Sequence, residues 1–136
     1  MKLTLEIENE FDFSLLGISC HAKDYRLSWA LNNSLNIKLK KEDDIHPELC
    51  EDGICFANSS YYDDIDHLQY ALISNKEDGA HLIPEFPQLD YFFKVSGPQH
   101  EYEIEHYKQI MQNMDLILTV LVIDPKTLKS KPNLVF

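Results

Sequence analysis

Two closely spaced prolines, Pro84 and Pro87, restrict the structure of this chain more than any other feature. They lie in residues 82–89, which run directly into the largely apolar residues 90–96. Proline has no amide donor, and the residue before a proline avoids the α-helical region. Residues 82–89 can therefore form neither a helix interior nor a central strand, and we expect an extended connector that leads into a strand.

The first third of the chain has the pattern of a βαβ unit, residues 13–41. Apolar residues recur at helical spacing over residues 22–35, and this helix lies between strands expected at 13–19 and 37–40. Asn36 is suited to the left-handed turn that ends a helix. A strand, a helix and a second strand in this order are the components of a crossover unit.

Two further features flank this unit in the sequence. Residues 2–8 alternate between apolar and polar side chains, which predicts a half-buried strand. After an acidic loop, the strand-like segments 54–62 and 67–75 are separated by four residues and predict an antiparallel hairpin, residues 54–75.

The last third predicts a second βαβ unit, residues 90–124. Pro98 follows Gly97 and is suited to the first turn of a helix, so we expect the helix to begin there. Residues 116–123 are almost uniformly apolar, which favours a strand that is covered on both faces or lies centrally under helices. Residues 125–136 are expected to form an extended tail whose final apolar residues dock.

Together these elements predict a single α+β domain over residues 1–136. We expect a two-layer sandwich with a mixed, mostly antiparallel sheet and two helices on one face. Two crossover units that share one sheet predict a ferredoxin-like or ACT-like arrangement with an added hairpin.

The charge balance restricts the partners. The 136 residues include 23 acidic and 12 basic side chains, a formal net charge of -11. Such a surface repels phosphate backbones and anionic membranes, so we expect no binding to nucleic acid or to a membrane. No run of about 18 apolar residues and no secretory signal is present. Three cysteines do not suit a closed disulfide framework, and we expect a cytoplasmic protein.

Several residues suggest chemistry, each with a simpler interpretation. Cys20 precedes a predicted helix, whose dipole would lower the pKa of its thiol and favour a nucleophile. The simpler interpretation is a small residue that fills space below the helix. His46, Cys50 and Cys55 could bind zinc, but their spacing is unusual and an acidic loop with incidental cysteines is the simpler interpretation. Asp63 and its acidic neighbours are typical of a solvated turn. The sequence predicts no metal, cofactor or catalytic residue.

The proline segment has a recognisable signature. Residues 83–91 read Ile-Pro-Glu-Phe-Pro-Gln-Leu-Asp-Tyr and resemble the defining motif of the IPExxxVDY family of small bacterial proteins, with Leu89 in place of valine. The segments LLGISCHAKDYRLSWALN and LKSKPNLVF are also similar to the family. The resemblance implies a cytoplasmic setting and no catalytic residues.

The candidate binding residues in this segment are Pro84, Glu85, Asp90 and Tyr91. In one interpretation they line a small site. In the other, the carboxylates bond to backbone donors of an irregular segment, because buried backbone groups need partners.

The leading functional hypothesis is a non-enzymatic, acidic, cytoplasmic protein-binding or adaptor module. It would associate with itself or with a basic protein surface, and its exposed aromatic residues would include Tyr61, Tyr62 and Tyr70 around the hairpin. One alternative is a small-molecule sensor of ACT-like type, and another is an enzyme that uses Cys20 as its nucleophile.

Overall fold

The computed structural model describes residues 12–47 and 53–136. Along the chain, the elements are β1 (Phe13–Cys20), α2 (Asp24–Leu35), β2 (Lys40–Lys41), β3 (Asn58–Asp63), β4 (Leu68–Ser74), β5 (Lys76–Glu77), β6 (Ala80–His81), β7 (Tyr91–Ser96), α3 (Ile104–Gln112), β8 (Ile117–Ile123) and the 3₁₀ turns η1 (Pro125–Thr127) and η2 (Lys131–Leu134). The strand predicted at residues 2–8 lies outside the described residues.

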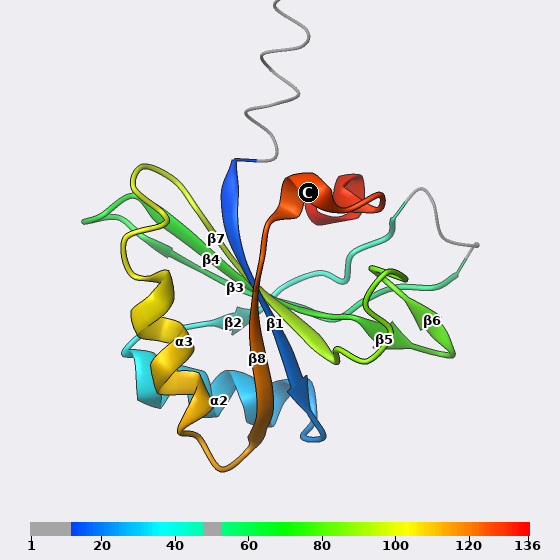
Figure 1. Cartoon of the computed structure of the whole chain (residues 1–136), viewed down its shortest axis with the longest axis horizontal. Helices are drawn as coiled ribbons and strands as arrows, with labels where there is room; N and C mark the ends of the chain where they lie inside the picture. The colour runs from blue at the N-terminus through cyan, green and yellow to red at the C-terminus, as the bar shows by residue number, and fades with distance from the viewer. Residues whose placement is uncertain (1–11, 48–52) are drawn as a thin grey trace, which may run out of the picture.

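Within the described residues, six strands form one sheet in the order β2-β3-β4-β7-β1-β8, and β5 pairs with β6 in a small second sheet. Each ladder between the named strands is antiparallel. Both helices pack on the same face of the large sheet (Figure 1). The order β8-β1-β7-β4, with a helix between β1 and β4 and another between β7 and β8, is that of a ferredoxin-like sandwich. The predicted α+β fold class is therefore confirmed, and β2 and β3 are the additional strands.

The strand expected at 37–40 is much shorter than predicted. Only Lys40 and Lys41 form β2, at the sheet edge beyond β3. The side chain of Asn32 explains the difference, because its Oδ1 accepts from the Leu39 amide at 2.7 Å and its Nδ2 donates to the Leu39 carbonyl at 3.1 Å. The backbone of Leu39 is thereby bound to α2, so it does not pair with a strand.

Helix α3 begins at Ile104, seven residues after the predicted start at Gly97. Gly97 has a φ of 120° and Gln99 a φ of 57°, and neither angle fits a right-handed helix. A Cβ on Gly97 would lie 2.4 Å from the carbonyl oxygen of His67, so β7 ends against the β3–β4 turn. The chain then makes turns before it enters the helix.

Strand β8 lies at the edge of the sheet, which contradicts the expectation of a central strand, and its exposed side chains contradict coverage on both faces. Ile117, Val120 and Ile123 are buried, but Leu118 is 61% exposed and Val122 is 49% exposed. An apolar run predicts a strand, yet it does not reveal whether that strand has a neighbour on both sides in the sheet.

The sheet has a hydrophobic core on each face. Residues of α2 and α3 cover one face, where Leu16, Ile18 and Phe93 are buried. The proline connector and the C-terminal segment cover part of the opposite face, and Leu89 and Leu134 are buried there. The predicted docking of the C-terminal apolar residues is therefore observed for Leu134, whereas Phe136 is 55% exposed. The tail is not extended as predicted, because it forms the turns η1 and η2, the first held by the Asp124 side chain, which accepts from the Lys126 amide.

The connector itself is not extended. It makes two consecutive turns, in which the Phe86 amide donates to the Ile83 carbonyl and the Leu89 amide donates to the Phe86 carbonyl, both at 3.1 Å. Leu89 packs so closely on β1 that a Cβ on Gly17 would lie 2.3 Å from its Cδ1. Only glycine fits at this contact without a shift of its neighbours.

Candidate functional site

Asp90 connects three segments at the start of β7. Its Oδ2 accepts a hydrogen bond from the Cys20 amide at 2.8 Å, and its Oδ1 forms an ion pair with Lys76 Nζ at 2.9 Å. Its own amide donates to the Ile18 carbonyl at 2.8 Å. The carboxylate therefore satisfies a backbone donor at the end of β1, which is a structural role.

The other residues of the signature point elsewhere. Glu85 accepts from the amide and the hydroxyl of Ser130, each at 2.8 Å, and so holds the C-terminal segment. Partial burial acts to raise the pKa of Glu85, but the hydrogen bonds from Ser130 outweigh it and the net pKa is lowered. Tyr91 is buried, which raises its pKa, and its hydroxyl donates to the Ala22 carbonyl at 2.6 Å. Pro84 is exposed.

The residue that organises the connector is Asn75, which our reading of the sequence missed. It is fully buried, and its Nδ2 donates to the carbonyls of Phe86 at 3.0 Å and Leu89 at 2.8 Å. Its Oδ1 accepts from the Ile83 amide at 2.7 Å. The geometry therefore assigns structural contacts to Glu85, Asp90 and Tyr91, and it does not bring the four signature residues around one cavity.

Cys20 is buried, and this burial raises the pKa of its thiol. The nearby Asp90 carboxylate acts in the same direction, whereas the Ala22 backbone and Arg26 partly oppose it. The expected lowering by the helix dipole is therefore wrong, because desolvation dominates. A protonated, buried thiol lacks the thiolate character of a nucleophile.

The proposed zinc ligands are only partly described. His46 and Cys55 lie in the described part of the chain, whereas Cys50 lies outside it. Within residues 12–47 and 53–136, no group of three His, Cys, Asp or Glu side chains could hold a metal ion. In the same ranges, no helix has the length and apolar character needed to cross a membrane.

The aromatic residues of the hairpin are less exposed than expected. Tyr70 is buried, and its hydroxyl lies 2.9 Å from that of Tyr107, so it belongs to the core between the sheet and α3. Tyr61 is half-buried and stacks on Tyr70, which leaves Tyr62 as the exposed member. Side chains of β4 alternate between the two faces of the sheet, and Tyr70 is on the face that α3 covers. The sequence does not reveal this contact with α3.

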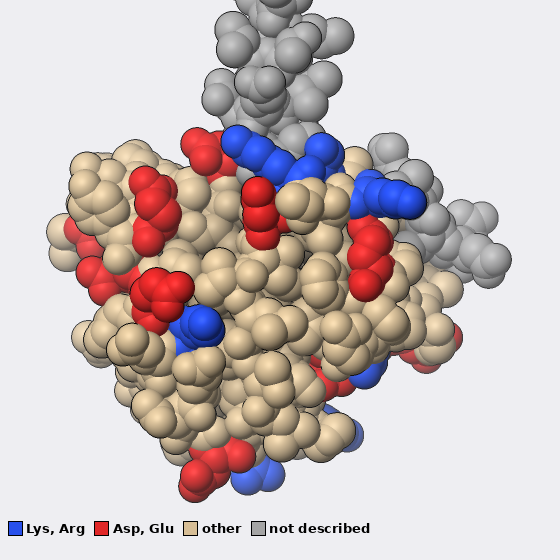
Figure 2. All heavy atoms as spheres, viewed as in Figure 1, with Lys and Arg blue, Asp and Glu red and all other residues tan. Residues whose placement is uncertain are grey.

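One end of the molecule is acidic. It comprises the β3–β4 turn and the segment before α3 together with its first turn, and we call it the acidic end. Its carboxylates are Asp63, Asp64, Asp66, Glu101, Glu103 and Glu105. The carboxylates of Asp63, Asp66 and Glu103 all help to raise the pKa of Tyr107, after the larger effect of burial, so the two segments lie close together. Figure 2 shows acidic side chains on this side of the molecule and basic ones over the C-terminal segment.

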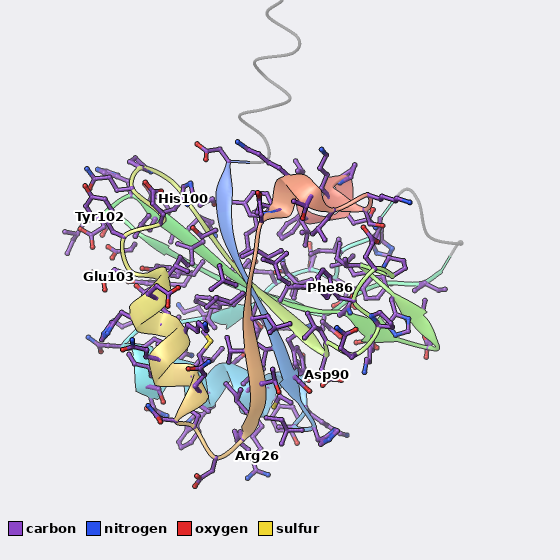
Figure 3. The ribbon with its side chains drawn as sticks, viewed as in Figure 1. Arg26, Phe86, Asp90, His100, Tyr102 and Glu103 are labelled. Atoms are coloured by element: carbon purple, nitrogen blue, oxygen red, sulfur yellow. The ribbon has the colours of Figure 1, made fainter. Side chains whose placement is uncertain are left out.

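Two large side chains are exposed among these carboxylates. Tyr102 is 72% exposed and Ile65, in the β3–β4 turn, is 84% exposed. Tyr102 and Glu103 also line a hollow of about 190 Å³ between the two segments. Figure 3 shows Tyr102 and Glu103 on the opposite side of the molecule from Asp90, so the acidic end is separate from the signature segment.

In the described part of the chain, the carboxylates of the acidic end form no ion pair with lysine or arginine. Glu101 has His100 nearby, at 3.4 Å. Asp63 instead accepts hydrogen bonds from the amides of Ile65 and Asp66, which confirms the predicted turn role.

No protein-family model matches this chain, and no curated protein sequence matches it either. The resemblance of residues 83–91 to the IPExxxVDY family stays a prediction from the sequence. The fold class is a ferredoxin-like α+β sandwich, and the candidate functional sites lie on its surface.

Proposed function

We propose that the protein is a non-enzymatic, cytoplasmic binding module of the IPExxxVDY family, and that its acidic end binds a basic segment of a partner protein. The observation that supports this most is the combination of six carboxylates without a Lys or Arg ion pair in the described chain and two exposed anchors, Tyr102 and Ile65.

The charge accounts for attraction and selectivity. Like charges gathered on one end of a protein raise its local potential and accelerate the approach of an oppositely charged partner. The same charges reject nucleic acid, which agrees with the overall charge of -11. A basic protein segment is therefore the favoured partner class.

The anchors account for affinity. Binding energy at protein interfaces is concentrated in a few buried side chains, among which tyrosine is enriched, with charged groups at the rim. Tyr102 borders a hollow that is also lined by Leu68 and Pro98. Ile65 lies in the β3–β4 turn, next to Asp66, which borders the same hollow. A partner with basic and apolar residues side by side matches this arrangement.

Affinity capture from the native lysate tests the proposal with a charge-neutralised variant. Glu101, Glu103 and Glu105 are changed together to glutamine, which neutralises one half of the acidic end. The control changes Asp43, Asp78 and Asp115 to asparagine, which removes the same charge from exposed positions elsewhere. We expect one partner that the wild type and the control retain and the glutamine variant loses. Its capture should also weaken as salt screens the charges.

A photo-crosslinking residue at position 102 then locates the contact, with position 25 on the exposed side of α2 as its control. A partner crosslinked from position 102 alone supports the proposal. Capture that is unaffected by the glutamine changes, or a crosslink from position 25 alone, would contradict it.

A second candidate is self-association through β8. This edge strand exposes Leu118, Leu121 and Val122, and no charged residue lies between positions 116 and 123. An exposed apolar edge is a template for pairing with another strand. Sedimentation of the wild type should show a dimer that Val122→Lys dissociates, whereas a monomeric wild type at high concentration contradicts this candidate.

A further inference from the structure

A hollow of about 560 Å³ lies on the sheet face opposite the helices. The connector and the C-terminal segment cover the apolar part of this face and leave its polar part open. The open part is formed by small or polar side chains of β3, β4 and β7, and Phe136 forms one wall. Its size is within the range of ligand pockets.

Lys94 extends from β7 into the wall of this hollow. Its Nζ donates to the Leu134 carbonyl at 2.6 Å and lies 4.6 Å from the ring centres of both Phe13 and Phe136. In the described part of the chain, no carboxylate forms an ion pair with Lys94. Burial of this charge lowers the pKa of Lys94 to about 8. A cation held away from water without a counter-ion is unfavourable, and a bound anion would compensate it.

Asn58 is a second unsatisfied group in the same hollow. Its side chain is 8% exposed, and its Oδ1 is buried without a hydrogen-bond partner. A buried amide oxygen without a donor destabilises a protein, and such groups in folded proteins need an explanation. A ligand with an N–H group would supply the missing donor.

Glu42 lies next to Asn58 and adds a negative charge. The Glu42 amide donates to the Asn58 carbonyl at 2.9 Å, and its Oε1 accepts from the Ser60 hydroxyl at 3.2 Å. Because both residues also border the hollow, two acceptors, one of them charged, lie at the same end of it. Asp43 also borders the hollow and makes this end more negative.

The sheet register separates the two ends. Lys94 is opposite Ala71, and Ala71 is opposite Ser60, which holds Glu42. Lys94 and Ser60 are therefore two strands apart, roughly 10 Å at a strand spacing of about 4.8 Å. Ala71 between them has a small side chain and leaves the space of the hollow open.

We propose that this hollow binds a small amino carboxylate, with its carboxylate on Lys94 and its amino group on Glu42 and Asn58. The separation of the two ends favours a molecule whose amino group is several atoms from its carboxylate. Phosphates and dicarboxylates are disfavoured, because their second negative charge would face Glu42 and Asp43. This site is separate from the acidic end, and neither proposal depends on the other.

The test is a titration of the ¹⁵N-labelled full chain, followed by NMR. The probes are glycine, 4-aminobutyrate and 6-aminohexanoate, with butyrate and butylamine as controls that each lack one charged group. We expect saturable shifts of the Asn58 side-chain amide and of backbone amides that border the hollow, such as those of Ala71 and Ser96. The backbone amides remain as the probe when position 58 is changed. Binding should be tighter for the longer amino carboxylates than for glycine or either control.

Substitutions at the Lys94 end and the Glu42 end of the hollow test whether each end contributes to this binding. Lys94→Met retains most of the length of the side chain and should weaken binding at least about tenfold, as loss of a charged hydrogen-bond partner does. Glu42→Gln should weaken the amino carboxylates but not butyrate. Lys23→Met removes an exposed charge outside the hollow and should leave affinity unchanged, as should Glu103→Gln in the acidic end.

Asn58→Leu is a second test variant, for the case that Lys94→Met alters the fold. It replaces the unpaired amide with an apolar side chain of similar volume and should preserve the fold while binding is lost. Shifts that do not saturate, or that persist in folded Lys94→Met and Asn58→Leu proteins, would overturn the proposal. So would a high-resolution crystal structure grown with 6-aminohexanoate in which Asn58 bonds only to water.

Discussion

The strongest quantitative prediction concerns the pH dependence of stability that Lys94 causes. Burial without a counter-ion lowers the pKa of Lys94 from 10.5 to about 8. Between these two values the unfolded chain binds a proton that the folded chain releases. The free energy of unfolding must therefore rise with pH across this window, and the contribution is lost as pH falls through 8.

The size of the effect follows from the shift. One pKa unit corresponds to about 1.4 kcal/mol, so the window from pH 7 to 9.5 should add roughly 2 kcal/mol from this lysine alone. Tyr70, Tyr91 and Tyr107 have raised pKa values because they are buried, and they act in the opposite direction near and above their ordinary value of 10. A measurement that stops at pH 9.5 and subtracts a variant isolates Lys94.

The assay is urea unfolding followed by circular dichroism at pH 7, 8, 9 and 9.5, for the wild type and for Lys94→Met. The difference between the two free energies of unfolding should change by roughly 2 kcal/mol in favour of the wild type as pH rises. Lys23→Met, at an exposed position, is the control and should show no such change. A difference that stays constant with pH would refute the claim that the charge of Lys94 is buried without a counter-ion.

Three further substitutions test the structural assignments, each by urea unfolding. Asp90→Ala should lower the free energy of unfolding by about 1–3 kcal/mol, because the Cys20 amide loses its acceptor. Lys76→Ala removes only the ion pair and should lower it by less than about 1 kcal/mol. Equal effects would argue against the backbone role of Asp90. Gly97→Ala should destabilise the protein more than Gly79→Ala. Both glycines have a positive φ, but only at position 97 would the new Cβ also clash with the His67 carbonyl. A smaller effect at position 97 would contradict this contact. Asn36→Ala should cost about 1 kcal/mol, because Asn36 has a left-handed φ of 57° after α2, and an unchanged midpoint would refute this.

The parts of the fold that could be predicted are those set by local pattern. Strands β1, β4 and β7 and helix α2 occur close to their expected positions because periodicity and a left-handed asparagine act within a few residues. The start of α3 could not be predicted from Gly97 and Pro98, since the positive φ angles there are set by the contact with the β3–β4 turn. The edge position of β8 likewise depends on strand order, which the local sequence does not encode.

The candidate sites were harder to predict than the fold, for a reason that Glu85 and Asp90 illustrate. Their sequence context suggested either a site or backbone anchors, and only the bonds to Ser130 and Cys20 distinguish the two. Asn75 looks ordinary in the sequence, yet it satisfies three backbone groups of the connector. A polar side chain acquires such a role from distant partners, which composition and spacing do not reveal.

Lys94 shows how the same strand can serve both the core and a site. It lies between Phe93 and Val95, which are buried under the helices, and alternation therefore directs it to the opposite face of the sheet. There the C-terminal segment packs over the core that contains Leu15 and Phe92 but does not fill the hollow bordered by Ala71 and Ser60. Lys94 lies at the boundary, with its charge bonded to a carbonyl. A lysine whose charge is fully solvated gains little from binding an anion, and a fully enclosed lysine is inaccessible to one. Its place at the edge of the covered area is what makes an exposed sheet face into a candidate binding site.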